Sequence, residues 1–68
     1  MSKEAYYDRV EAYTSRAAAL YPGEVVFNKI QLAKISGKSP QTLYNNRDRY
    51  YFRTAKITIK EFVRMEMS

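Results

Sequence analysis

Two side-chain amides, those of Gln41 and Asn45, stand four residues apart near the middle of the chain. In a helix, residues at this spacing lie on one stripe of the surface. Each amide both donates and accepts hydrogen bonds, which matches the N6 and N7 edge of adenine in duplex DNA. If Leu43 faces the core, the outward side chains beside this stripe are candidates for reading bases. They are Gln41, Thr42, Tyr44 and Asn45.

Thr42 suits the methyl group of a thymine, whereas Tyr44 serves equally well as a half-buried core ring. Cationic and hydroxyl side chains nearby could contact the phosphates of a nucleic acid. These candidates are Lys38, Ser39, Arg47, Arg49, Arg53 and Lys56. Ser39 is also a good helix cap, and the basic residues after position 46 could equally form an ordinary solvated surface.

The excess positive charge is confined to the second half of the chain. Residues 1–27 contain three basic and four acidic side chains, a net charge of −1. Residues 28–68 contain nine basic and three acidic ones, a net charge of +6, so the whole chain carries +5. Such one-sided basicity favours a polyanionic partner, either DNA or RNA.

Two helices are predicted before the candidate site. Apolar residues with gaps of three and four predict a helix over residues 3–20, with an inner stripe of Tyr6, Val10, Tyr13, Ala17 and Leu20. Residues 24–27 then form either a brief extended segment or a loop whose Val26 and Phe27 fill the core. Asn28 caps a second, short helix that ends at Gly37. Its expected inward side chains are Ile30 and Ala33, with Leu32 and Ile35 as further candidates.

The clearest helix start is Ser39-Pro40, because serine caps a helix and proline suits the first position, where no N–H is needed. This third helix is predicted from Pro40 to about Arg47. The turn after Gly37 is so short that the second and third helices must cross at a large angle. Residues 49–53 are rich in residues that favour strands. Thr58 and Glu61 resemble a capping box that opens a last helix through about Met65.

These elements predict one mainly α domain over residues 1–68, with three to four short helices and a central helix-turn-helix at about residues 29–47. A minimal β wing over residues 50–57 is an open alternative. No glycine marks a wing turn there, so residues 54–56 could equally form a plain loop.

The segment from Leu32 to Asn45 resembles the helix-turn-helix of bacterial and phage DNA-binding regulators. Ala33 is small where the two helices of that motif touch, Gly37 stands in the turn, and Leu43 is the apolar anchor of the second helix. The Ser-Pro-Gln-Thr start is also typical of recognition helices in that family. The family usually has an apolar residue after the turn glycine, whereas this chain has Lys38, which could extend over the surface and meet a phosphate.

The segment after this motif is similar to the short wing and closing helix of the MerR/excisionase type. The aromatic and basic run at 50–53 precedes a helix with the pattern Thr-x-x-acid-apolar, at residues 58–62. This resemblance implies a winged DNA-binding domain of phage or plasmid type.

The composition argues against catalysis. The chain has no cysteine and no histidine, which removes the commonest general base and the usual zinc ligands. We therefore expect no enzyme and no cofactor or metal. Charged residues interrupt the N-terminal segment, and no apolar run approaches the roughly 20 residues of a membrane span. These features predict a soluble, cytoplasmic protein with no membrane partner.

Two classes of function remain open. The first is sequence-specific binding of duplex DNA, with residues 40–47 in the major groove, by a transcriptional regulator or an excisionase-like architectural factor. The second is a small protein-interaction module, an adaptor or inhibitor that docks through the amphipathic first helix and the aromatic patch. A homodimer is compatible with the first class, since small regulators often read two half-sites.

Overall fold

The computed structural model describes residues 3–52 and 54–68, so the prediction made for Arg53 lies outside the described residues. Four helices follow one another in the chain: α1 (Lys3–Leu20), α2 (Lys29–Ser36), α3 (Pro40–Asn45) and α4 (Ile59–Met67). The described ranges contain no strand, and the predicted mainly α fold is confirmed.

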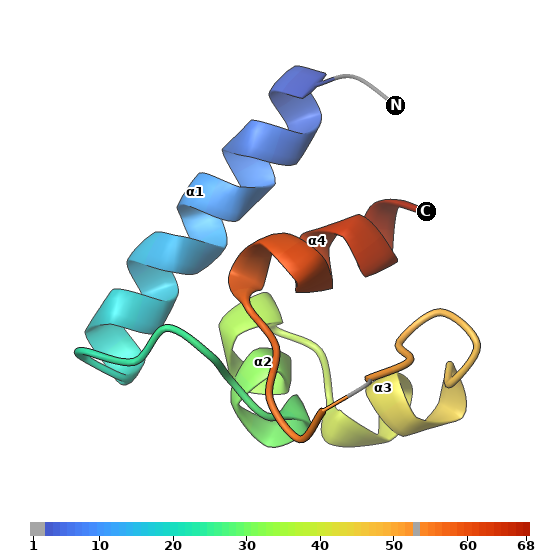
Figure 1. Ribbon diagram of the computed structural model, residues 1–68. Helices are drawn as coiled ribbons and strands as arrows, with labels where there is room; N and C mark the ends of the chain where they lie inside the picture. Colours follow the sequence, from blue (N-terminus) through green and yellow to red (C-terminus); the bar gives the residue numbers. More distant parts are fainter. Residues whose placement is uncertain (1–2, 53) are drawn as a thin grey trace.

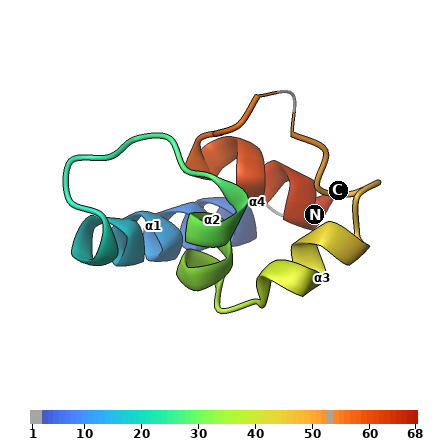
Figure 2. The same cartoon turned by 90° about the horizontal axis from the view of Figure 1, so that it is seen from below.

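The helices pack in a simple order, with α1 against α4 and α2, and α2 against α3. Figure 1 shows α1 running along one side of the molecule, with α2 and α3 below α4. Seen from below, α2 lies between α1 and α3 (Figure 2). The helix that carries the candidate base-reading residues therefore lies at the edge opposite α1, where a large partner can approach it.

Helix α1 has the predicted bounds. Ala17 is buried, and Tyr6, Val10 and Tyr13 pack on the core as expected. Leu20 was expected to join them, but 47% of its surface is exposed, and the next residue, Tyr21, packs on the core instead. Arg16 ties α1 to its neighbour, since its Nη1 donates to the backbone oxygen of Ile35 in α2 at 2.7 Å.

Caps fix both ends of α2. The side chain of Asn28 accepts from the backbone N–H of Gln31 at 2.8 Å, and the side chain of Gln31 accepts from the N–H of Asn28 at 2.9 Å. At the other end Gly37 has a φ of +78°, a conformation that a side chain would disfavour. The N–H of Lys38 then donates to the oxygen of Ala33 at 3.0 Å, which closes the turn.

The inner face of α2 consists of Leu32, Ala33 and Ile35, all buried. The expectation for Ile30 is wrong, since this side chain is 56% exposed. Ile30 and Leu32 are two positions apart and point to different sides of a helix. The larger set around Leu32 and Ile35 faces the core, and Ile30 is left at the surface.

The loop before α2 and the loop before α4 meet in one antiparallel bridge. The N–H of Phe27 donates to the oxygen of Ile57 at 2.8 Å, and the N–H of Ile57 donates back at 3.0 Å. Both side chains are buried in the core. Phe27 thus fills the core as one alternative predicted, whereas Val26 beside it is exposed.

The described part of residues 49–57 forms a loop, and a β wing is not found there. Its first aromatic, Tyr50, is buried and stacks on Phe62 of α4 with ring centroids 5.5 Å apart. Phe52 packs partly on the core, whereas Tyr51 is 69% exposed and lies outside the core.

Helix α4 starts as predicted, with the Thr58 hydroxyl accepting from the N–H of Glu61 at 3.3 Å. It continues to Met67, two residues beyond the predicted end. Its buried face consists of Ile59, Phe62, Val63 and Glu66. Within the described ranges, no helix combines the length and apolar character that a bilayer crossing needs.

Candidate nucleic-acid interface

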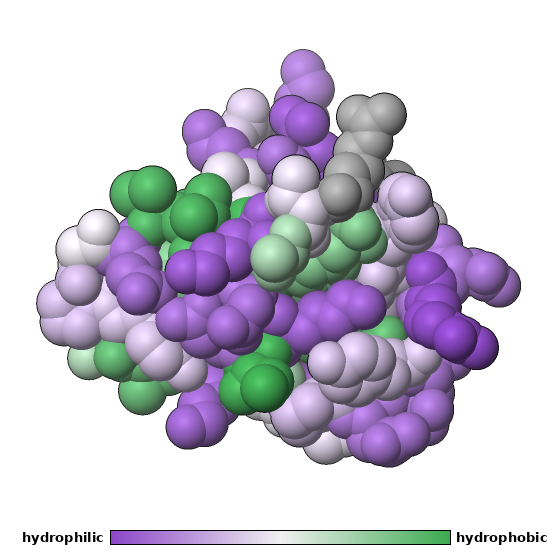
Figure 3. Space-filling model, turned by 60° about the horizontal axis from the view of Figure 1, so that its bottom comes forward, coloured by the Kyte–Doolittle hydropathy of each residue, from purple (hydrophilic) through white to green (hydrophobic). Residues whose placement is uncertain are grey.

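Helix α3 is oriented by one buried side chain. Leu43 has no exposed surface, and it anchors this six-residue helix against the core as expected. Gln41, Tyr44 and Asn45 are exposed, because residues beside a buried position on a helix turn outward. Figure 3 shows the side of the molecule on which α2 and α3 lie, where hydrophilic side chains cover most of the surface and apolar side chains form separate patches.

The two amides of α3 hold each other in place. The Nε2 atom of Gln41 donates to the Oδ1 atom of Asn45 at 3.0 Å. This contact leaves the Oε1 acceptor of Gln41 and the Nδ2 donor of Asn45 facing solvent. The two groups lie side by side on one outward stripe, as the spacing predicted, and the pair still has N–H donors and carbonyl acceptors available for a partner.

Thr42 and Ser39 are engaged at the start of α3. The Ser39 hydroxyl accepts from the N–H of Thr42 at 3.2 Å and lies 2.9 Å from the Thr42 hydroxyl. Thr42 is half-buried. The helix ends at Asn45, two residues before the predicted end, because Asn46 leaves helical geometry and its amide donates to the oxygen of Thr42 at 2.7 Å. Thr42 is therefore less available for a base than its two amide neighbours.

Lys38, predicted to meet a phosphate, has a partner inside the fold. Its ammonium forms an ion pair with the carboxylate of Glu66 in α4. The Glu66 side chain is only 2% exposed, and it also accepts from the Tyr13 hydroxyl at 2.8 Å and lies 3.7 Å from Nη1 of Arg9. A buried carboxylate needs such partners, since its desolvation is costly. Lys38 supplies one of these partners, so its charge is compensated inside the fold.

Glu66 joins three parts of the fold, namely α1, the turn after α2, and α4. The sequence carried a signal for it, because Ile59, Phe62 and Glu66 share one helical face, with spacings of three and four. A carboxylate on that face predicts a buried ion pair. Only the tertiary structure shows that Tyr13 and Lys38 are its partners.

The Tyr13 hydroxyl is the titratable group that this cluster perturbs most clearly. Burial raises its pKa, and the hydrogen bond to Glu66 and the negative charge of Glu66 raise it further, against a smaller opposing effect of Arg9. The neutral hydroxyl is therefore favoured in the folded protein relative to the unfolded chain.

We expect this perturbation to make stability depend on alkaline pH. The contribution of Tyr13 is fully present below the ordinary tyrosine pKa of about 10, and it is lost progressively as the pH rises above that value. The Tyr13→Phe variant should therefore show a shallower fall in the free energy of unfolding between about pH 9 and pH 11.5, measured by urea denaturation. Tyr51→Phe is the matched control, because Tyr51 is exposed. Parallel pH profiles for wild type and Tyr13→Phe would contradict the expectation.

The other predicted phosphate contacts lie at the C-terminal end of α3 and in the loop beyond it. Arg47, Arg49 and Lys56 are exposed. The two arginines line a hollow of about 480 Å³ together with Asn45, Asn46 and Asp48. This hollow adjoins the amide stripe through Asn45, so a strand of nucleic acid lying against that stripe would pass close to both arginines.

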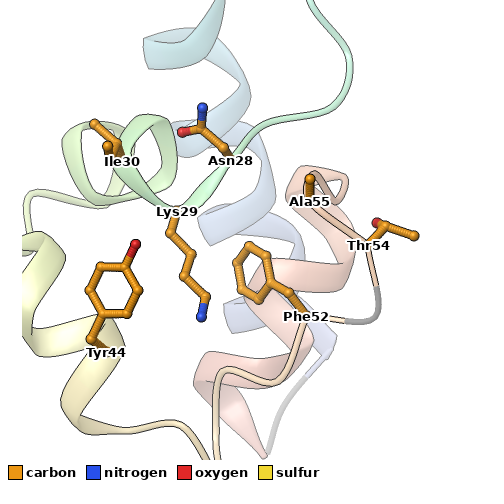
Figure 4. A pocket seen from close by; sticks show the side chains of 7 residues that line it. All are labelled: Asn28, Lys29, Ile30, Tyr44, Phe52, Thr54 and Ala55. Atoms are coloured by element: carbon orange, nitrogen blue, oxygen red, sulfur yellow. The ribbon is translucent and has the colours of Figure 1, made fainter.

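Lys29 was not among the predicted contacts, yet it lies beside α3. Its ammonium is 4.9 Å from the ring centroid of Tyr44 and 5.1 Å from that of Phe52. Figure 4 shows the lysine between the two rings, in a groove that Asn28, Ile30, Thr54 and Ala55 also line. Attraction between an ammonium and an aromatic face holds such a side chain in place. Two aromatics and one lysine far apart in sequence gave no local pattern from which to predict this contact.

No family model matches the chain, and no curated protein or solved structure matches it either. In residues 3–52 and 54–68, no three carboxylates gather into a group that could bind a metal ion. The side chains of the site offer amide groups, exposed guanidinium groups and a lysine between two rings.

Proposed function

We propose that this protein binds duplex DNA in a sequence-specific way, with α3 in the major groove. The observation that carries the proposal is the burial of Leu43, which turns Gln41 and Asn45 outward as one hydrogen-bonded pair. The resemblance to helix-turn-helix regulators supports the same function. The corresponding role is that of a transcriptional regulator or an excisionase-like architectural factor of phage or plasmid type.

The chemistry of base reading depends on the amide pair. A major groove is about 12 Å wide and admits one helix. In the free protein the Gln41 amide donates one hydrogen bond to the Asn45 amide, which meets part of the hydrogen-bonding capacity of each group. On DNA the pair can open so that either amide donates to N7 and accepts from N6 of an adenine. The exposed Arg47, Arg49 and Lys56 would neutralise phosphates on the flank, which positions the helix without reading sequence.

The test is a set of affinities of Gln41→Ala and Asn45→Ala for a duplex selected from random sequences and for its single-base variants. Each substitution should lose about 1–3 kcal/mol of discrimination at one base pair and leave binding to unrelated duplexes nearly unchanged. Ser15→Ala, an exposed position on α1, is the control and should change neither quantity.

A different result would redirect the proposal. If both amide variants weaken binding to all duplexes equally, these side chains do not read bases. The protein would then bind DNA through its shape and backbone, as an architectural factor does.

A protein-interaction module is the second candidate, and exposed apolar side chains favour it. Leu20, Val25 and Val26 all lie at the surface close to the turn after α1. The inner stripe of α1 packs on the protein's own core, so a partner would meet this turn rather than that stripe. The absence of any affinity for duplex DNA at low salt would favour this candidate over the first.

A further inference from the structure

The groove between α2, α3 and the following loop holds a positive charge with no carboxylate against it. In the described part of the chain, the ion pairs are those of Glu66 with Arg9 and Lys38, and Lys29 takes part in neither. Its neighbours in the groove are the rings of Tyr44 and Phe52. The groove is about 400 Å³ in volume and open to solvent (Figure 4). An ammonium in this setting is complementary to an anion.

We propose that Lys29 binds one phosphate of the DNA backbone in this groove and thereby fixes the position of α3 along the major groove. The inference rests on the proposed function and deepens it, because it names a contact that sets the register of the amide stripe. Tyr44 stands three residues after Gln41, so the two share one side of α3, and Tyr44 also forms one wall of the groove. A phosphate held by Lys29 therefore lies close to one member of the amide pair.

The rings prepare the lysine for this contact. A free lysine loses much side-chain entropy when a partner orders it. Lys29 is half-buried and already held between two aromatic faces, so less of that entropy remains to be lost on binding. An ammonium has three donors and binds phosphate as a point charge. The phosphate can thus approach the open side of the groove while the rings keep their contact.

The first measurement compares Lys29→Met with Lys34→Met by fluorescence anisotropy on the selected duplex and on a scrambled one. Methionine keeps the apolar stem and removes the charge. Lys34 is an exposed lysine of the same helix, so its variant corrects for the general loss of one positive charge. Lys29→Met should weaken binding to both duplexes about tenfold more than Lys34→Met does, and should flatten the log–log salt slope by about one unit.

A second measurement tests the role of the rings. Phe52→Leu should weaken binding about threefold when Lys29 is present and should have no effect in the Lys29→Met background, because coupled residues are not additive. Phe52 packs partly on the core, and the double variant controls for any loss of folding. Thermal melts of all variants confirm that each is folded during the binding assay.

The outcomes distinguish the phosphate contact of Lys29, the role of the two rings and DNA binding itself. Equal losses for Lys29→Met and Lys34→Met, in a protein that binds DNA, overturn the inference and leave the proposed function standing. Additive effects of Phe52→Leu and Lys29→Met overturn the role of the rings as positioning groups. A wild-type protein that binds neither duplex overturns the proposed function and this inference with it.

Discussion

Replacing Leu43 with alanine is expected to lower the free energy of unfolding by roughly 2–4 kcal/mol, because truncation of a fully buried leucine loses apolar burial and leaves a cavity. Leu43 has no exposed surface. Helix α3 has six residues, well below the length at which an isolated helix is stable in water. Its position therefore depends on the contacts of this side chain with the core, and DNA binding should fall together with stability.

The measurement is urea denaturation of Leu43→Ala followed by circular dichroism. Leu20→Ala is the matched control, because Leu20 stands near the end of α1 with much of its side chain exposed, and a surface substitution of this kind stays within about 0.5 kcal/mol. A domain of this size buries a modest share of its surface and has little stability to lose. Equal midpoints for the two variants would show that another residue anchors α3.

Local signals account for the features that the sequence predicted well. The caps at Asn28, Ser39 and Thr58 each act within four residues of their own position, and the structure has a helix start at each of them. Gly37 ends α2 for the same local reason, its left-handed backbone. The burial of Leu43 and the exposure of its neighbours follow from helical geometry once the start of α3 is known. These features depend on residues close together in the sequence, so they can be predicted without knowing the rest of the fold.

Features that depend on distant residues were missed. The aromatic content of residues 49–53 favours a strand, but a strand also needs a partner along its length. The backbone pairs instead at Ile57, with Phe27 thirty residues earlier. Tyr50 finds its packing on Phe62. A local pattern of strand-favouring residues therefore could not distinguish a wing from a loop.

The two lysines of the site were misjudged for the same physical reason. Lys38 looked like a surface cation because its partner, Glu66, is 28 residues away. Lys29 was not among the predicted contacts, because Tyr44 and Phe52 reach it only through the fold. The structure thus places the two lysines in different surroundings from those expected. The lysine predicted to meet phosphate forms an internal ion pair, and the other stands beside α3 with its charge uncompensated by any carboxylate in the described residues.

Binding to duplex DNA is expected to weaken roughly 300- to 1,000-fold when the salt concentration rises from 50 to 200 mM, because phosphate contacts release counterions. This expectation is based on the net charge of +6 over residues 28–68. The pairing of Lys38 with Glu66 removes one positive and one negative charge from this segment, so the net charge available to a polyanion is unchanged. Neutralisation of about 4–6 phosphates gives a log–log slope of roughly −4 to −5.

The individual charges can be assigned by substitution. Arg49→Ala and Lys56→Ala should each flatten the slope by about one unit, since both side chains are exposed on the loop that comes after α3. Arg64→Ala is the matched control. Arg64 is an exposed residue of α4, outside the proposed interface, and its loss should change the slope least. A slope near zero for the wild-type protein would mean that phosphates contribute little to binding, and the proposal of a DNA interface around α3 would have to be abandoned. A steep slope that none of the single substitutions alters would instead place the interface on another face of the molecule.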